Sequence, residues 1–256
     1  MRLTVDLNSD LGEAFGAYTI GRDSEIIPLV SSVNIATGFH AGDPNVMEKT
    51  VELAVKSKVA IGAHPGFPDL QGFGRRSMEL QPGEIRTLIL YQIGALDAFC
   101  RTAGSKVSYV KPHGALYNQA EKDLGVALEI VKAIFDYDPQ MYILSAYGSQ
   151  MSVAAKQIGL QTANEFFADR GYEPDGSLVE RSKPNAIIHD SKIALKRVIR
   201  ALNEGVVEAV NGQDIPMQVD SICVHGDSES ALNFVREIRQ GLSENDFTIK
   251  SFSTIK

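Results

Sequence analysis

The stretch Ile61–Arg76, IGAHPGFPDLQGFGRR, begins in a predicted strand, Val59–Ile61, and continues as a loop rich in glycine and proline. His64 follows the strand, and Arg75 and Arg76 stand at the far end of the loop. Such a loop is poor at building a core, but it can bring backbone and charge close to a small anionic ligand. Taken alone, the stretch is explained equally well by a surface loop with solvated arginines. The rest of the chain decides between the two interpretations.

The arrangement recurs along the chain. Apolar strands alternate with amphipathic helices, and polar residues, often histidine beside glycine, follow nearly every strand. Strands are expected at residues 3–7, 32–36, 59–61, 107–110, 141–145, 160–163 and 221–224, with a terminal strand at 247–252. Alternating strands and helices predict a parallel sheet, and polar ends on most strands favour a closed barrel over an open sheet. We therefore predict an α/β fold, a TIM-like (β/α) barrel with seven strands.

The domain organisation is expected to be simple. No long linker, charge block or low-complexity segment divides the chain, so residues 1–256 are predicted to form a single barrel domain. The Asp175–Gly176 dipeptide is a hairpin signal and predicts a small flap at residues 171–181. Long helices are expected from Gly83 to about Ala103 and from Asp190 to about Ala209.

Acidic and imidazole side chains follow the first two strands. Asp10 and Glu13 come after the first strand, where they are either site residues or ordinary turn formers. His40 lies between glycines just past the second strand, and Asp43 precedes a proline in a pattern that caps the next helix. Because ligands bind outside the carboxyl ends of parallel strands, these positions predict a site.

The fourth strand leads into Lys111 and His113, whose two-residue spacing points both side chains to the same side of an extended chain. A lysine at the end of a buried strand is costly unless it is paired, so Lys111 requires an anionic partner in the protein or in a ligand. The later strand ends add Glu165, Arg170, His225 and Asp227.

Composition excludes several classes of protein. The formal charge of −7 and the absence of a basic run with interleaved aromatics argue against a nucleic-acid-binding protein. Cys100 and Cys223 are too few and too far apart for a disulfide framework or a zinc site, and their apolar surroundings predict buried free thiols. No segment has 18 uninterrupted apolar residues and no cleavable apolar leader is evident, so we expect a cytoplasmic protein with no membrane partner.

Several motifs together carry a family resemblance. They are Asp6–Asp10, Gly38–Asp43, Gly62–Asp69, Lys111–Tyr117 and Val224–Asp227, which occur in this order over essentially the whole chain. These strings resemble the LamB/YcsF family, which is identified as the A subunit of bacterial ATP-dependent 5-oxoprolinase. The resemblance implies cleavage of the lactam 5-oxo-L-proline (pyroglutamate) to L-glutamate, coupled to hydrolysis of ATP to ADP and phosphate, in a complex with two further subunits, B and C. It also implies a fold similar to the barrels of the glycoside hydrolase/deacetylase superfamily.

The chemistry at the strand ends is compatible with this activity. A five-membered lactam is a poor electrophile, and ATP can drive its opening if the amide oxygen is first phosphorylated. Such a site must hold a carboxylate and phosphate oxygens and must supply an acid or base. The catalytic candidates are Asp10, Glu13, His40, His64, Lys111, His113 and Glu165. The candidates for binding substrate or phosphate are Arg75, Arg76, Asp43, Arg170, His225 and Asp227.

The expected cofactor is ATP with Mg²⁺, although its position is open. The sequence contains neither a Gly-x-x-x-x-Gly-Lys-Ser/Thr loop nor a kinase-type glycine loop. The nucleotide therefore binds either through Mg²⁺ and groups at the barrel end or mainly on a partner subunit.

Two alternatives belong to other functional classes. One is a stand-alone metal-dependent hydrolase such as a deacetylase, in which the four histidines at strand ends bind Zn²⁺ with an aspartate. A resident metal is otherwise unknown, and its candidate ligands are Asp10, His40, His64 and Asp43. Against a deacetylase, no two of the five histidines are four residues apart, whereas sugar deacetylases carry a His-x-x-x-His pair. The other alternative is a non-catalytic subunit that binds a small acid and activates its partners.

Overall fold

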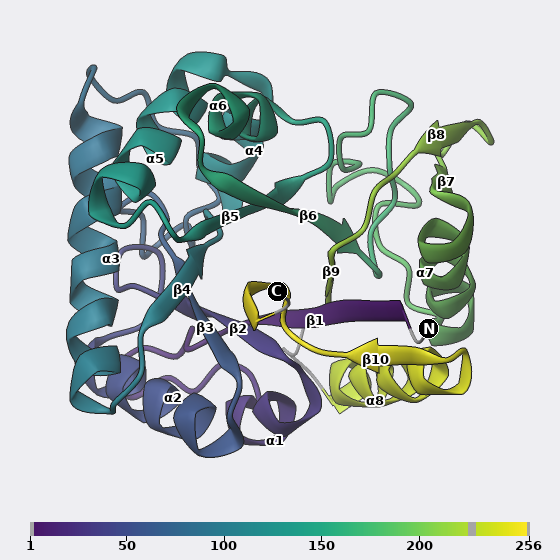
Figure 1. The fold of residues 1–256 in the computed structure, drawn as a ribbon, viewed down its shortest axis with the longest axis horizontal. Helices are drawn as coiled ribbons and strands as arrows, with labels where there is room; N and C mark the ends of the chain where they lie inside the picture. The colour runs from purple at the N-terminus through teal and green to yellow at the C-terminus, as the bar shows by residue number, and fades with distance from the viewer. Residues whose placement is uncertain (1–2, 225–228, 255–256) are drawn as a thin grey trace.

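The computed structural model describes residues 3–224 and 229–254, whose strands close into a barrel (Figure 1). Within these residues, seven parallel strands neighbour one another in the order β1-β2-β3-β4-β5-β6-β9, and β9 pairs with β1 to close the ring. The strands are β1 (Leu3–Leu11), β2 (Ser32–Ala36), β3 (Ala60–His64), β4 (Val107–Val110), β5 (Tyr142–Ala146), β6 (Gln161–Phe167) and β9 (Ser221–Cys223). The predicted seven-stranded (β/α) barrel is confirmed.

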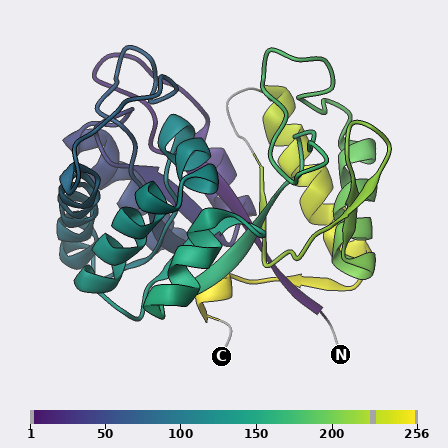
Figure 2. The ribbon, with the colours of Figure 1, turned by 90° about the horizontal axis from the view of Figure 1, so that it is seen from above.

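Helices surround this barrel and cover the apolar outer faces of its strands (Figures 1 and 2). They are α1 (Asp23–Ile26), α2 (Pro44–Ser57), α3 (Glu84–Thr102), α4 (Gly114–Lys122), α5 (Leu124–Tyr137), α6 (Gln150–Ile158), α7 (Ser191–Glu204) and α8 (Glu229–Glu244). The helix α3 shows why these segments fold as they do, because Ile85, Ile89, Ile93 and Leu96 recur at helical spacing and are all buried. No helix in the described ranges is long and apolar enough to cross a membrane.

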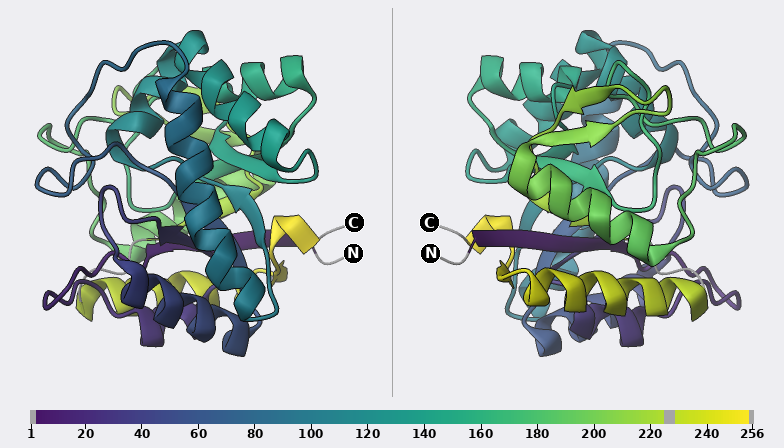
Figure 3. Two further views of the ribbon diagram at one scale, coloured as in Figure 1. Left: turned by 90° about the vertical axis from the view of Figure 1, so that its left-hand side faces the viewer. Right: turned by 90° about the vertical axis from the view of Figure 1, so that its right-hand side faces the viewer.

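The chain ends and the functional loops lie at opposite ends of the barrel. Figure 2 shows the loops after β3 and β6 on the side away from both termini. In Figure 3, α3 faces the viewer on one side of the molecule, and α7 with the hairpin of β7 (Val206–Glu208) and β8 (Asp214–Pro216) covers the other. The short strand β10 (Phe247–Ile249) pairs with Leu3–Val5, outside the closed ring.

Several elements differ from the prediction, and one of them is the terminal strand expected at residues 247–252, which ends at Ile249. The first strand does not end at residue 7, because Asn8–Leu11 pair with β2 and extend it to Leu11. The helix expected to reach residue 209 ends at Glu204, where Gly205 takes a left-handed conformation (φ 69°) and the chain turns into the β7–β8 hairpin. The helix α4 was not predicted, since Pro112 and Gly114 mark its start as a turn.

The interior of the barrel is polar along β1, where successive inward-facing side chains form a column. The buried Asp6 carboxylate accepts hydrogen bonds from the hydroxyls of Ser31, Ser32 and Ser221. Desolvation by burial raises the pKa of Asp6 to about 6, although the three hydroxyls act in the opposite direction. Higher in the column, Asn34 Nδ2 donates to Asn8 Oδ1 at 2.8 Å and to Asp10 Oδ1 at 2.7 Å.

The segment between β6 and α7 forms a long loop beside the barrel mouth. Within it, Tyr172 and Leu178 form an isolated antiparallel bridge, and Arg170 forms another with Ile187. The buried Arg170 guanidinium also donates from Nε to Ala186 O at 3.1 Å and from a terminal nitrogen to Val179 O at 2.6 Å. This arginine therefore holds the two arms of the loop together.

Candidate active site

A cavity of about 530 Å³ opens at the carboxyl ends of the strands. Its wall contains acidic, basic and imidazole side chains from several strand ends, including Asp10, Glu13, His64, Arg75, Lys111 and His113. This is the end of a parallel barrel at which enzymes place their catalytic groups. The cavity is the candidate active site.

Lys111 lies on the cavity wall directly after β4, and its side chain is almost completely buried. The Nζ atom lies 2.8 Å from Asp10 Oδ1 and 2.7 Å from Glu165 Oε1, and it donates to Cys223 Sγ at 3.3 Å. Burial alone would lower the pKa of this ammonium, but the Asp10 and Glu165 carboxylates raise it well above its ordinary value. Lys111 is therefore a charged group, and the structure supplies the anionic partners that a buried lysine requires.

The loop after β3 and the start of α4 are held together by backbone contacts. His113 N donates to Pro65 O at 2.8 Å, and Ala115 N donates to Gly74 O at 2.9 Å. In β3 itself, the Nδ1 atom of His64 donates to Lys111 O at 2.7 Å. These contacts fix two histidines from different strand ends against each other.

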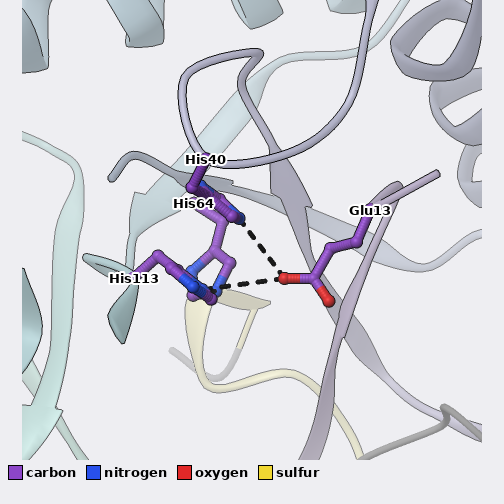
Figure 4. Close-up of side chains that lie close together, drawn as sticks. All are labelled: Glu13, His40, His64 and His113. Atoms are coloured by element: carbon purple, nitrogen blue, oxygen red, sulfur yellow. Dashed lines mark hydrogen bonds and ion pairs between the residues drawn. The ribbon is translucent and has the colours of Figure 1, made fainter. Parts of the chain in front are cut away.

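Three buried histidines and one glutamate form a compact cluster (Figure 4). His40 Nε2 lies 3.3 Å from Glu13 Oε1, and His113 Nδ1 lies 3.6 Å from the same oxygen. His64 Nε2 lies 2.9 Å from His113 Nδ1, and the ring of His40 stacks on that of His113 with 3.7 Å between centroids. One ligand atom from each of the four residues falls within 4.8 Å of the others, so the cluster can hold a metal ion.

Burial favours the neutral form of two imidazoles in this cluster, those of His40 and His113. Desolvation lowers the pKa of His40 and of His113 well below the ordinary value, and the neighbouring imidazoles act in the same direction. Neutral imidazole is the form of histidine that binds metal ions.

The glycines of the Ile61–Arg76 loop allow the cluster to form. A Cβ atom on Gly66 would lie 2.8 Å from His40 Nδ1, and one on Gly74 would lie 2.7 Å from His40 Cβ and 2.8 Å from His113 Cδ2. Gly74 also has a φ of 63°, a conformation that favours glycine. The sequence predicted that this loop approaches a ligand, whereas these two glycines make room for the imidazoles.

Several predicted site residues lie elsewhere or have other contacts. Arg76 pairs with Asp69 inside its own loop, and Asp43 caps α2 by accepting from Asn45 N and Val46 N. Neither belongs to the described lining of the cavity, whereas Arg170 borders the cavity but uses donors on the backbone of the neighbouring loop. Glu165 and His40 are buried and contact the wall residues Lys111 and His113, respectively. The predicted residues His225 and Asp227 lie outside the described residues.

Sequence reasoning missed Glu121, which lines the cavity from α4. Burial raises the pKa of this carboxyl to about 8, with a further contribution from the charge of Glu165. Glu121 follows Tyr117, another wall residue, by one helical turn. The i, i+4 spacing could have identified the pair, but only after α4 had been recognised as a helix.

The fold and the site together define a (β/α)-barrel protein whose polar cavity lies at the carboxyl ends of its strands. The family model of the LamB/YcsF family matches residues 5–256. The chain belongs to the LamB/YcsF family, as its motifs predicted.

Similar proteins agree with this assignment. The 5-oxoprolinase A subunit of Clostridium beijerinckii is 55% identical over 245 residues, which cover 96% of each chain. The 5-oxoprolinase A subunit of Alkaliphilus metalliredigens is 51% identical and covers 98% of each chain. The crystal structure of a lactam utilization protein from Thermus thermophilus superposes with a TM-score of 0.93 at 42% identity, covering 98% of this chain and 100% of that one. Each of these relatives matches almost the whole of this chain.

Proposed function

We propose that this chain is the lactam-binding A subunit of an ATP-dependent 5-oxoprolinase. It opens 5-oxo-L-proline to L-glutamate while ATP is hydrolysed to ADP and phosphate. The proposal draws on the names of relatives that match almost the whole chain at about half identity. The single observation that carries it in the structure is the charged Lys111, held between Asp10 and Glu165 on the wall of a cavity of about 530 Å³.

The cavity offers groups that suit a small lactam acid. The substrate carries one carboxylate and one amide carbonyl, and both need cationic or hydrogen-bond-donating partners. Arg75 lies on the wall beside Phe73, with its guanidinium carbon 5.0 Å from the ring centroid, and can take the carboxylate. Lys111 is placed to stabilise negative charge on the amide oxygen or on a phosphoryl group that it receives.

Ring opening also requires an acid and a base. Glu13 and His113 lie on the cavity wall, and we assign them to activating the attacking water, either directly as bases or as ligands of a metal ion that would do so. Glu121, whose pKa of about 8 keeps its carboxyl protonated near neutral pH, can donate a proton to the departing lactam nitrogen. Each of these groups comes from a different strand end or helix, as is usual for barrel enzymes.

The nucleotide and the partners belong to the assembled complex. We propose that ATP enters with Mg²⁺ and that subunits B and C supply part of its binding site, because this chain has no glycine-rich phosphate loop. We further propose that residues 171–181 act as a flap on a single barrel domain. Ser177 and Glu180 of this segment already border the cavity, where they can cover a bound substrate.

Reconstitution tests the proposal. Glutamate release from 5-oxo-L-proline is measured with this chain alone, with subunits B and C added, and with and without ATP and Mg²⁺. We expect turnover only in the complete mixture with nucleotide. A complex that assembles but releases no glutamate from 5-oxo-L-proline would refute the proposed function.

The buried cluster of Glu13 and three histidines favours a second candidate, a metal-dependent hydrolase that acts alone. ATP-independent hydrolysis of an amide by the isolated chain would support it. The third possibility is a non-catalytic subunit that binds a small acid and activates its partners, and turnover by the isolated chain would exclude it.

A further inference from the structure

In the cluster, a ring nitrogen of His64 and a ring nitrogen of His113 face each other. If both imidazoles are neutral, neither nitrogen carries a hydrogen that it could donate to the other. The backbone carbonyl of Lys111 can only accept, so His64 carries its proton on Nδ1, which lies 2.7 Å from it. The carbonyl of Phe73 likewise fixes the proton of His113 on Nε2, at 2.8 Å. The bare nitrogens, His64 Nε2 and His113 Nδ1, are left 2.9 Å apart with their lone pairs turned toward each other.

Such a contact is repulsive unless a cation lies between the nitrogens. A proton shared by these two nitrogens would remove the repulsion, but it would not involve Glu13 or His40. Glu13 Oε1 converges on the same place, 3.6 Å from His113 Nδ1, and His40 Nε2 lies 3.3 Å from that oxygen. One ion that uses four donor atoms accounts for the whole arrangement, whereas without it a shared proton and a separate hydrogen bond between His40 and Glu13 are both required.

The distances between the donor atoms fit a small divalent ion. Bonds of about 2.0–2.1 Å in tetrahedral geometry place donor atoms about 3.4 Å apart. The separations of 2.9, 3.3 and 3.6 Å lie on either side of this value. Three imidazoles and one carboxylate are a donor set typical of zinc and its neighbours in the first transition series, and not of Mg²⁺ or Ca²⁺.

We propose that Glu13, His40, His64 and His113 bind one divalent transition-metal ion of the zinc class. The backbone carbonyls of Lys111 and Phe73 hold two of the ligand imidazoles in the required tautomer, as carbonyls commonly do around metal sites. This set of ligands differs from the one predicted from the sequence. It keeps His40 and His64, but it contains Glu13 and His113 instead of Asp10 and Asp43. Asp43 is occupied in capping α2, and Asp10 Oδ1 pairs with Lys111.

The neighbouring charges permit a divalent ion at this place. Lys111 shares the cavity wall with the cluster, but Asp10 and Glu165 offset its charge. Asp10 Oδ2 also lies 3.5 Å from His64 Nε2, on the metal-binding side of that ring. The Glu13 carboxylate adds a further negative charge to the ion itself.

The metal would lie beside the groups assigned to the lactam. A bound ion of this class supplies Lewis-acid chemistry, polarising a carbonyl oxygen or lowering the pKa of a bound water. This catalytic role rests on the proposed function, whereas metal binding itself does not depend on which reaction the cavity performs.

Metal binding is tested on the whole chain without an activity assay. The purified protein is stripped with a chelator and titrated with Zn²⁺, and bound metal is counted by mass spectrometry. Co²⁺ then serves as a spectroscopic probe, because its visible absorption reports nitrogen and oxygen ligands in a four- or five-coordinate site. We expect about one ion per chain and an intense visible Co²⁺ spectrum.

Two ligand variants and one matched control locate the ion. Glu13→Gln and His113→Gln should each weaken Zn²⁺ binding by at least about 100-fold. His189→Gln removes an exposed histidine outside the site and should bind Zn²⁺ like the wild type. The proposal would be overturned if the wild type bound less than about a tenth of a Zn²⁺ ion per chain. It would also be overturned if His113→Gln and His189→Gln bound Zn²⁺ equally well, and either result would favour a shared proton. Bound metal without 5-oxoprolinase turnover would refute the proposed function and leave the metal site standing.

Discussion

At the scale of single residues, the barrel interior is organised by charges that are buried with their partners. Lys111 illustrates what the sequence can predict, because a lysine after an apolar strand needs an anion wherever it lies. The sequence could not identify Asp10 and Glu165 as those anions, since they come from strand ends about 100 and 54 residues away in the chain. Only the closure of the barrel brings these three side chains together.

Asp6 provides a test, at this scale, of how burial changes the pKa of a carboxyl group. The pKa of its carboxyl is 3.8 in an ordinary environment and about 6 in the folded chain. The folded protein therefore keeps this proton up to a higher pH than the unfolded one. The stability that Asp6 contributes is therefore fully present below about pH 4 and is lost as the pH rises through about 6.

We expect Asp6→Asn, which cannot ionise, to escape this loss. The difference in free energy of unfolding between variant and wild type should shift in favour of the variant by about 2 kcal/mol between about pH 4 and pH 7.5. Urea unfolding at the two pH values measures it, with the exposed substitution Glu52→Gln as control. A difference that stays constant with pH would show that the Asp6 carboxyl ionises normally in the folded protein.

At the scale of elements, the site depends on how the Ile61–Arg76 loop packs against the start of α4. The alternating pattern predicted the strand β3 and the glycine-rich loop after it, but not what the glycines contact. Their partners, His40 and His113, lie in other strand-end loops, and local propensity carries no information on such distant contacts. The same limit concealed α4, whose start contains turn-forming Pro112 and Gly114.

Gly74→Ala tests the role of this packing. The new methyl group would press on His40 and His113 at less than 3 Å, so we expect the histidine cluster to be displaced. Zn²⁺ affinity and turnover of the reconstituted complex should each fall at least about 10-fold. Gly104→Ala is the matched control, because Gly104 has a similar φ of 71° but no atom within 4 Å of its added Cβ. Equal losses in the two variants would attribute the effect to backbone strain alone.

At the scale of the whole molecule, alternation of strands and helices was sufficient to predict the seven-stranded barrel. The polar residues that follow nearly every strand identified the functional end. The β7–β8 hairpin escaped prediction, because its two short strands carry little pattern. The terminal strand was predicted, but its pairing beside β1 joins residues far apart in the chain and could not be. Closure through β1 and β9 is a long-range pairing, and it is this pairing that converts a series of strand ends into one cavity.

The central claim is that this cavity cleaves the lactam. The most direct test changes Lys111 alone and measures the rate of ATP-dependent glutamate release by the three-subunit mixture. We expect Lys111→Gln to lower kcat by at least about 100-fold, as loss of a preorganised charge beside the reacting oxygen does in other enzymes. Lys56→Gln, an exposed change on α2, should leave the rate unaltered. Because Lys111 is buried, circular dichroism must show that the variant is folded. Arg75→Gln, at the exposed rim, provides a second variant, for which we expect the KM for 5-oxo-L-proline to rise about 10-fold. A folded Lys111→Gln chain that supports wild-type turnover would contradict the assignment of the reaction to this cavity.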